Sequence, residues 1–458
     1  MNELTFTTAT DLAEMIRTRQ VSAIEVLEAQ LAHIAAHNPA LNAVVTLDEA
    51  GARERARSAD AALAKGEEWG PLHGVPMTLK DAHAVAGMRT TCGFPPLADY
   101  VPPEDGSAAA RLKAAGAIIM GKTNVPTLLA DAQTDNPIFG RTNNPWDLAR
   151  TPGGSSGGAC AAVAAGMTPL EVGTDLSGSI RMPAHCCGVY GLKPTEHRVS
   201  LEGIVAGPPN GPRPVRIMST VGPIARSLDD LALGLQVLAG PDRRDTEVPP
   251  VALVPHDTPS LRNLRVAWAP TFPSIPVAND IRAAIERLAS ELEGRGSRVE
   301  ACLPNVDFGA QGELFNDLLG LIMGAFQPAE EANEPITLAA YFAALARRDG
   351  FIRQWEDFFD DWDVLICPTA MTPAFAHCPQ GAPIDLDGAQ VDYWNFFGHS
   401  FPFNLTGHPA LVMPCGQDRV GLPIGVQLVG QLWSEEKLLA IARAVEPLTG
   451  GFQRPRGY

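Results

Sequence analysis

The chain has 458 residues, of which 35 are Lys or Arg and 52 are Asp or Glu, so its formal net charge at pH 7 is −17. Proteins that bind nucleic-acid phosphates gather Lys and Arg on one surface, whereas this chain is acidic and has no basic run, which argues against a nucleic-acid partner. A hydrophobic fraction of 45% is enough for a large core. Length alone predicts about three domains of roughly 150 residues each.

The cysteines and the first residues predict where the protein resides. The eight cysteines form no CxxC pair, so we expect reduced, mostly buried thiols. Acidic residues at positions 3, 11 and 14 stand where a signal peptide would need an apolar core, which predicts a cytoplasmic protein. The longest apolar run, residues 318–326, is about half of the ~20 residues that cross a bilayer, so we expect no membrane partner.

In chain order, the first third is predicted to be mainly helical, with Ser22 and Glu25 forming a capping box at the start of the second helix. Helices are predicted at residues 9–19, 22–37, 48–65, 108–115, 159–166, 279–294 and 435–445. Strands are predicted at residues 74–81, 117–120, 264–268 and 363–367. A loop is predicted at residues 207–214, which are rich in Pro and Gly, and a second connector at residues 241–259. This alternation of helices and strands favours a layered α/β fold.

Several short motifs match functional patterns without the context that the chemistry needs. Residues 116–123, GAIIMGKT, match the phosphate-binding loop pattern, but their apolar middle is typical of a strand, so nucleotide binding is kept only as a rival of another class. His33 and His37 have helical metal-ligand spacing but lack the Glu of a zincin motif. Ser434 begins an SxxK pattern at a polar helix start, where a serine is typical of an N-cap.

The glycines concentrate between residues 151 and 194, where two turns carry serines: Gly153 to Gly158 and Gly173 to Ser179. Gly153-x-Ser155-x-Gly157 fits the nucleophile elbow of α/β-hydrolases, but the turn-forming residues 143–147 precede it in place of an apolar strand. A flexible Gly/Ser linker is also excluded, because residues 159–166 predict a tightly packed small-residue helix. Two strained turns near each other therefore indicate a site.

These turns make the chain resemble the amidase signature family. The resemblance is carried by GGSSGG at 153–158, GTDLSGSIRMPA at 173–184 and the upstream Lys80-Asp81. It is supported by GKTN at 121–124, NPWD at 144–147, GLKPT at 191–195, NLTGHPA at 404–410 and GLPIGVQLVG at 421–430, so it covers nearly the whole chain. It implies one large α/β domain over residues 1–458, with a mixed central β-sheet covered by helices on both faces. A catalytic core at about residues 70–230 would be completed by a C-terminal part at about 260–458, which would finish the sheet and the substrate pocket.

The resemblance also implies a Ser-Ser-Lys catalytic triad with Ser179 as nucleophile, Ser155 as bridging serine and Lys80 as base. A serine hydroxyl is a weak nucleophile until a base takes its proton, and a lysine can do so only when neutral, a form that burial favours. Lys80 ends the apolar run 75–79, so its burial is expected. Ser155 would relay the proton demand to Ser179 and later help to protonate the departing amine. No metal or cofactor is implied.

The same resemblance places the oxyanion on the backbone N–H groups of Leu176, Ser177, Gly178 and Ser179. Residues 174, 175 and 181 would hold this loop without taking part in the chemistry. The family pattern here is GTDxGGS, and this chain has Ser177 in place of the first paired glycine. If that position needs a positive φ, the serine carries a strain of about 1–3 kcal/mol. Alternatively, its hydroxyl lines the pocket.

Substrate contacts are expected in two segments that line the pocket in the family. One is residues 127–136, where Leu129 and the polar Asp131 stand; a loop-stabilising role for Asp131 is equally open. The other is the aromatic cluster at residues 393–403, from which we select Trp394 and Phe397. Core packing is the simpler interpretation of that cluster, and an aromatic-lined pocket for aryl or alkyl acyl groups is the hypothesis.

The predicted function is a stand-alone serine amidohydrolase that cleaves a small-molecule carboxylic amide, or a related ester, to acid and amine or ammonia. For the oligomeric state we consider a homodimer. The nearest alternative is the glutaminase subunit of a tRNA-dependent amidotransferase, which would need a partner subunit. The departure at Ser177 favours the stand-alone enzyme only modestly.

Overall fold

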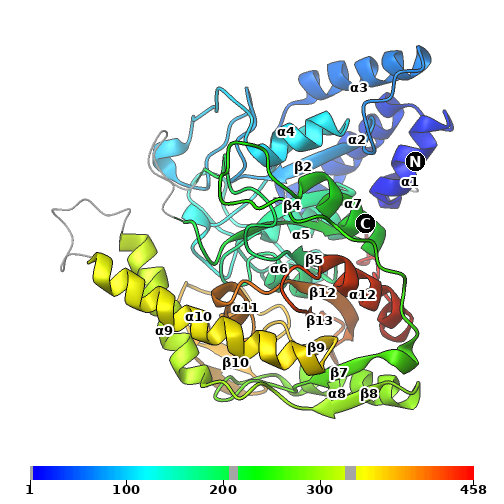
Figure 1. Ribbon diagram of the computed structural model, residues 1–458. Coiled ribbons are helices and arrows are strands. Elements are labelled where there is room, and N and C mark those ends of the chain that lie inside the picture. Colours follow the sequence, from blue (N-terminus) through cyan, green and yellow to red (C-terminus); the bar gives the residue numbers. More distant parts are fainter. Residues whose placement is uncertain (1–3, 206–214, 325–336) are drawn as a thin grey trace.

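An eight-stranded sheet runs through the middle of the computed structural model, which describes residues 4–205, 215–324 and 337–458 (Figure 1). Its strands, in spatial order, are β4 (Leu170–Asp175), β6 (Thr220–Ala225), β5 (Tyr190–Lys193), β12 (Ala410–Gln417), β13 (Pro423–Val429), β9 (Val364–Pro368), β7 (Arg265–Trp268) and β8 (Arg298–Ala301). The first six pair antiparallel, and β9, β7 and β8 pair parallel. The predicted mixed sheet is confirmed.

A second, smaller sheet lies against the start of the first and carries Lys80. It contains β1 (Val44–Leu47), β3 (Ile118–Thr123) and β2 (Pro76–Lys80), with β2 parallel to β3 and β3 antiparallel to β1. β2 and β4 are each at the edge of their sheets and contact each other. A two-stranded hairpin, β10 (Ile384–Leu386) and β11 (Ala389–Val391), completes the strands of the described residues.

Helices cover both faces of the large sheet, as predicted. One layer consists of α7 (Leu228–Leu238), α12 (Glu435–Thr449) and α8 (Asn279–Gly294), which contact one another through α12. A second pair, α5 (Gly157–Ala164) and α6 (Arg181–Cys187), is fully buried, and α5 contacts strands of both sheets. The small residues of α5, none larger than Val, allow this close approach.

The remaining helices lie outside this core. They are α1 (Ala9–Arg17), α2 (Ala23–Leu41), α3 (Glu49–Ala64), α4 (Ser107–Ala114), α9 (Phe308–Gly324), α10 (Leu338–Asp361) and α11 (Phe401–Leu405). The capping box of Ser22 and Glu25 is present at the start of α2. Figure 1 shows α9 and α10 side by side at the edge of the molecule, and the two helices contact each other.

Most predicted elements are confirmed within a few residues, and the differences have physical reasons. α2 continues to Leu41, past its predicted end at residue 37, and stops only where Asn42 adopts a left-handed conformation. Length predicted about three domains, which is wrong: the chain folds as one domain, because strands from residue 170 to residue 429 share one sheet. The predicted loop at 207–214 lies outside the described residues, whereas 241–259 is a loop as expected.

The structure shows the state of the cysteines and the character of the helices. All eight cysteines are unpaired; six are buried, and Cys302 and Cys378 are partly exposed. Within the described ranges, no helix combines the length and the apolar character that a membrane crossing requires.

Candidate active site

Lys80 is the last residue of β2, and its side chain is completely buried. The apolar residues before Lys80 form β2, and this strand places the Lys80 amine among several hydroxyl groups. Its Nζ lies 2.7 Å from Ser155 Oγ, 2.8 Å from Ser156 Oγ and 2.8 Å from Thr174 Oγ1. The predicted proximity of Lys80 and Ser155 is therefore present in the structure.

The serine turn at 153–158 is held tightly by its neighbours, which explains its glycines. Gly153 has φ +84°, and a Cβ there would lie 2.8 Å from the backbone of Pro183. At Gly158, the first turn of α5 approaches Asn124 so closely that a Cβ would lie 2.4 Å from the Asn124 backbone nitrogen. The peptide bond between Gly154 and Ser155 is cis. Only glycine fits at Gly153 and Gly158, so the motif fixes where Ser155 lies.

Ser179 follows β4 and comes close to the first serine turn. The backbone N–H of Ser156 donates a hydrogen bond to the Ser179 carbonyl over 3.1 Å, which joins the two turns directly. Ser179 retains 6% exposure and Ser155 only 1%. The structure thus brings Lys80, Ser155 and Ser179 into one buried region, although they come from β2, the α5 entrance and the end of β4.

Burial determines the protonation of Lys80. Removal from water lowers its pKa to about 7, and Cys92, Asp175, Cys160 and Glu171 counteract this only in part. A lysine with this pKa is substantially neutral at pH 7, and a neutral amine can accept the proton of the Ser155 hydroxyl. The three hydroxyl oxygens around Nζ serve as acceptors when the amine is charged.

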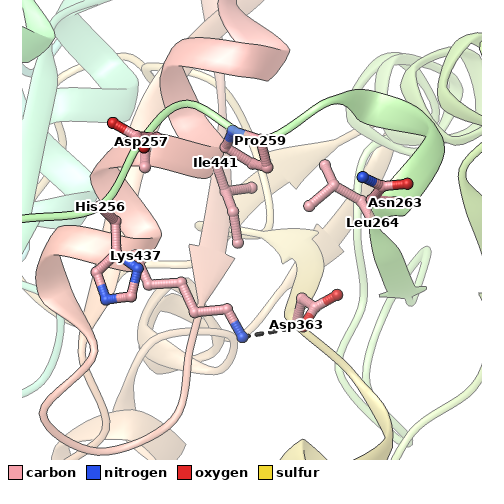
Figure 2. Close-up of a pocket in the computed structure, with 9 residues that line it drawn as sticks. His256, Asp257, Pro259, Asn263, Leu264, Asp363, Lys437 and Ile441 are labelled. Atoms are coloured by element: carbon pink, nitrogen blue, oxygen red, sulfur yellow. Dashed lines mark hydrogen bonds and ion pairs between the residues drawn. The ribbon is translucent and has the colours of Figure 1, made fainter.

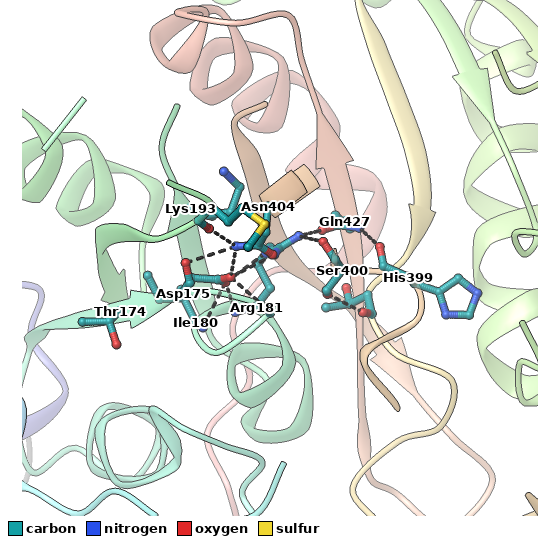
Figure 3. A network of polar contacts seen from close by, with 12 residues as sticks. Thr174, Asp175, Ile180, Arg181, Lys193, His399, Ser400, Asn404 and Gln427 are labelled. Carbon is teal, nitrogen blue, oxygen red and sulfur yellow. Dashed lines mark hydrogen bonds and ion pairs between the residues drawn. The ribbon is translucent and has the colours of Figure 1, made fainter. Parts of the chain in front are cut away.

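A buried carboxylate, Asp175, organises the loop that carries Ser179 (Figure 3). Its oxygens accept the backbone N–H groups of Gly178 at 2.7 Å and of Ile180 at 3.1 Å. The guanidinium of Arg181 donates to the same carboxylate from Nε at 3.0 Å and from Nη2 at 2.9 Å. Burial alone would raise the pKa of Asp175, but the Arg181 charge and these hydrogen bonds hold it well below its usual range.

Residues from the C-terminal half complete this network. Arg181 Nη1 donates to the Ser400 carbonyl at 2.9 Å and to Gln427 Oε1 at 2.7 Å, and Asn404 Nδ2 donates to Asp175 Oδ1 at 2.9 Å. Figure 3 shows Arg181 extending between Asp175 on one side and Gln427 and Ser400 on the other. The nucleophile loop is thus held by strands and helices that follow it by more than 200 residues.

The predicted oxyanion donors differ in whether they are available. The Gly178 N–H is already engaged by Asp175. In the part of the chain that the structure describes, the N–H groups of Leu176, Ser177 and Ser179 donate to no protein acceptor. Gly178 has φ +119°, and a Cβ there would lie 2.7 Å from Ser400 Cβ, so this position in the loop requires glycine.

The condition under which Ser177 would be strained is not met. Ser177 is not among the residues with positive φ, whereas Gly178 is. The left-handed conformation of this loop therefore falls on the glycine that the chain retains, so a serine at 177 is accommodated without strain. Ser177 is partly exposed, which leaves its hydroxyl near the entrance of the loop.

The four residues selected for substrate contact lie in two neighbouring segments. A Cβ on Gly154 would stand 2.5 Å from the Asp131 carbonyl oxygen and 2.6 Å from that of Gln133, so segment 127–136 packs directly on the serine turn. The Tyr393 hydroxyl donates to Asp131 Oδ1, which ties this segment to the aromatic cluster. Asp131 is partly buried, and burial raises the pKa of its carboxyl. Leu129 is partly exposed.

The aromatic cluster divides into core and surface. Tyr393 and Phe396 are buried and pack with Phe375, as the simpler interpretation expected. Trp394 is 52% exposed and stacks on the partly exposed Phe397, with ring centroids 5.9 Å apart. Trp394 therefore presents an apolar surface, and Phe397 packs on one side against the core cluster of Tyr393 and Phe396 and on the other against Trp394.

Comparison with known proteins places this geometry in a family. The model of the family described as Amidase matches residues 25–320 and 329–439. The chain belongs to the amidase family. It is 36% identical to a glutamyl-tRNA(Gln) amidotransferase subunit from Roseiflexus castenholzii over 96% of both chains. It is also 36% identical to the indoleacetamide hydrolase of Bradyrhizobium diazoefficiens over 96% of this chain and 86% of that protein.

A solved structure supports the same assignment. A bacterial aryl acylamidase of the amidase signature family superimposes with a TM-score of 0.86 and 26% identity over 99% of each chain. The predicted family, α/β fold and amide-hydrolysing enzyme class are confirmed by these matches.

The amidase fold gives no support to the rival of another class. The residues of the phosphate-loop pattern form the buried strand β3, and Lys122 donates to the His83 carbonyl inside the protein. A phosphate loop instead curls around an anion and opens a helix. The match to the nucleotide-binding pattern is therefore accidental.

A surface hollow elsewhere on this amidase lacks the chemistry of the site. Figure 2 shows it beside α12, with a volume of about 190 Å³ and an ion pair of 2.9 Å between Lys437 and Asp363. It is lined by His256, Asp257, Pro259, Asn263, Leu264, Asp363, Lys437, Ala440 and Ile441. It shares no residue with the region of Lys80, Ser155 and Ser179, and its lysine is already paired.

Sequence reasoning missed Ser156 as a direct contact of Lys80 and expected Thr174 to be structural only. Both place a hydroxyl oxygen 2.8 Å from Nζ. The doubled serine in GGSSGG and the hydroxyl in GTD were available signals for these contacts. Asn404 and Gln427 lie in quoted motifs, but their contact with Arg181 and Asp175 could not be derived from sequence spacing.

Proposed function

We propose that this amidase is a serine amidohydrolase that forms an acyl-enzyme on Ser179. The observation that carries the proposal is the fully buried Lys80, whose amine lies 2.7 Å from Ser155 Oγ and whose pKa is lowered by burial to about 7. Activation of a serine requires a neutral base within hydrogen-bond distance of its hydroxyl group, and Lys80 meets both conditions.

In the proposed mechanism, neutral Lys80 accepts the proton of Ser155 while Ser155 accepts that of Ser179. Ser179 Oγ attacks the amide carbonyl, and the carbonyl π electrons move to oxygen to give a tetrahedral oxyanion. The N–H groups of Leu176, Ser177 and Ser179 stabilise this oxyanion, and one such donor typically contributes about 10²–10³ in rate. When the C–N bond breaks, Ser155 returns a proton to the amine, which leaves neutral.

The second half of the reaction repeats these proton transfers with water as the nucleophile and Ser179 as the leaving group. Water enters, gives a proton through Ser155 to Lys80 and attacks the acyl carbon. Collapse of the second tetrahedral intermediate breaks the bond to Ser179, which recovers its proton. The products are an acid and an amine, or ammonia when the substrate is a primary amide; an aryl or alkyl ester would release an alcohol by the same steps.

Covalent labelling tests the proposal without knowledge of the substrate. A fluorophosphonate is expected to label Ser179, as located by mass spectrometry of the digested protein. Ser179→Ala is expected to abolish the label, whereas Ser177→Ala, in the same turn, is expected to retain it. Labelling that survives Ser179→Ala would refute the assignment of the nucleophile.

For the substrate, we propose that Leu129, Asp131, Trp394 and Phe397 contact the acyl group. The support is the packing of the Asp131 segment on Gly154 and the exposed stack of Trp394 on Phe397. A panel of amides and esters is expected to show preference for aryl or alkyl acyl groups over small charged ones. Trp394→Ala is expected to raise KM for the aryl substrates selectively.

The alternative is a glutaminase subunit of a tRNA-dependent amidotransferase, because relatives named as amidotransferase subunits match as well as the indoleacetamide hydrolase does. Glutamine hydrolysis that begins only when a partner protein is added would support it. The cytoplasmic location and the homodimer stay predictions, which cell fractionation and light scattering can check.

A further inference from the structure

Two sheet edges face each other beneath the candidate site. β2 pairs only with β3, and β4 pairs only with β6, so each of the two strands has one edge without a strand partner among the described residues. The two edges contact each other, and Figure 1 shows β2 and β4 adjacent. An unpaired edge leaves backbone N–H groups that need acceptors when they are buried.

Side chains of the β4 segment supply these acceptors. The N–H of Thr78 donates to Thr168 Oγ1 at 3.1 Å, and the N–H of Lys80 donates to Glu171 Oε2 at 3.1 Å. Residues 78 and 80 are two apart on the strand, so their N–H groups point to the same side. The contact between the two sheets is thus made by side chains, and one of them binds the backbone of the lysine itself.

Glu171 connects three strands through one carboxyl group. Besides the Lys80 N–H, Oε2 accepts the N–H of Val172 at 2.7 Å, and Oε1 accepts the hydroxyl of Thr123 in β3 at 2.8 Å. The side chain is completely buried. Burying a carboxyl group is costly, and a neutral amide could make the same number of hydrogen bonds, so the presence of an ionisable carboxyl group here calls for an explanation.

We propose that Glu171 is a positioning residue that fixes Lys80 against the β4 segment leading to Ser179 and supplies a buried negative charge to the Lys80 amine. This inference rests on the proposed role of Lys80 as the base. Glu171 lies on the strand that continues into Thr174 and Asp175, so one rigid element holds the backbone of the lysine at one end and contacts its amine at the other.

The charges around Glu171 and Lys80 determine the direction in which Glu171 shifts the pKa of Lys80. Burial raises the pKa of Glu171 to about 7, and the Glu171 charge in turn opposes the lowering of the Lys80 pKa that burial causes. The titratable groups facing the pair are Asp81, His83 and Cys92 after β2, Lys122 on β3, Cys160 on α5 and Asp175 on β4. Of these, the Lys122 charge acts on Glu171, and that of Asp175 on Lys80.

The test is the pH dependence of fluorophosphonate inactivation of the full chain between about pH 5 and 10. In the wild type the inactivation rate is expected to rise with pH as Lys80 loses its proton. Glu171→Gln removes the charge and retains the hydrogen-bonding shape, so its rise is expected at a pH lower by about 0.5–1 unit. Asp230→Asn, which alters another buried carboxyl that accepts backbone N–H groups, is the matched control and is expected to leave the midpoint unchanged.

Thr123→Val is a second variant that keeps the inference testable if Glu171→Gln does not fold. It removes a hydrogen bond that stabilises the charged carboxylate, so it is expected to shift the midpoint in the same direction by a smaller amount. A midpoint equal to that of the wild type, with inactivation slowed equally at every pH, would overturn the charge effect and leave a structural role only. Absence of labelling at Ser179 in the wild type would instead refute the proposed function.

Discussion

The ion pair between Arg181 and Asp175 offers the sharpest test of how the nucleophile loop is held. Both side chains are 0% exposed, and Arg181 also donates to Ser400 and Gln427. Arg181→Leu would leave the Asp175 carboxylate buried without its cation, and breaking a buried pair in this way costs about 3–5 kcal/mol. Asp175 would then no longer hold the N–H groups of Gly178 and Ile180 with the same geometry.

This cost converts into a measurable change of melting temperature. Unfolding entropy is about 2.1 cal/mol/K per residue near 60 °C, so 458 residues give about 1 kcal/mol/K, and the expected decrease in Tm is about 3–5 °C. Because Ser179 follows the same loop, kcat/KM is expected to fall by about 10²-fold, the effect of a misplacement of about 1 Å. Differential scanning calorimetry and the hydrolysis of a panel substrate measure the two quantities.

A surface pair provides the control for this prediction. Arg443 pairs with Asp229 at 2.9 Å, but the Asp229 side chain is 72% exposed, so Arg443→Leu is expected to change stability by about 0–1 kcal/mol and Tm by less than about 1 °C. If Arg181→Leu does not fold, Arg181→Lys, which keeps the charge and loses the paired hydrogen bonds, takes its place with a smaller expected loss. A Tm for Arg181→Leu within about 1 °C of the wild type would refute the reasoning.

Three further predictions concern the same site. Since Lys80 must be neutral and its pKa is about 7, kcat/KM is expected to fall by about tenfold per pH unit well below that value and to level off above it; a flat profile from pH ~5 to ~9 would contradict this base. In Gly178→Ala the new methyl group would clash with Ser400, and residue 178 would still need φ +119°, so a loss of about 1–3 kcal/mol of stability together with activity is expected. Gly294→Ala, which has open space around it, is expected to lose neither. Ser177→Gly relieves no strain, so Tm is expected to stay level or fall slightly and kcat/KM to change by less than about threefold; a clear rise in Tm would show that the serine is strained.

The sequence predicted the elements whose cause is local. The capping box at Ser22 and the apolar run that ends at Lys80 are set by neighbours within a few residues, whereas the glycines at 153 and 178 also make room for the distant Pro183 and Ser400. Such patterns locate strands, helix starts and turns without knowledge of the rest of the chain. The candidate triad was implied by the family resemblance, and the apolar run before Lys80 predicted only its burial.

The interactions that could not be predicted are those between distant segments. Asn404 and Gln427 contact Arg181 across more than 200 residues, and nothing in their own spacing indicates that partner. Whether Ser177 is strained could not be decided from the sequence, because a motif shows which residue differs but not which residue has the positive φ. In the structure that residue is Gly178. The contacts of Glu171 could not be predicted either, because its partners Lys80 and Thr123 lie on β2 and β3, which come from distant parts of the sequence.

The position of the site between two sheets explains why its parts come from separate motifs. Lys80 lies at the end of an edge strand of the small sheet, and Thr174 lies near the end of an edge strand of the large sheet. Ser155 enters from the start of α5, the helix that contacts both sheets. A buried amine at such a junction is far from water, which lowers its pKa, yet it still finds hydroxyl acceptors from either side. The same junction that depresses the pKa of the lysine therefore also places the hydroxyl groups of Ser155 and Ser156 within hydrogen-bond distance of its amine.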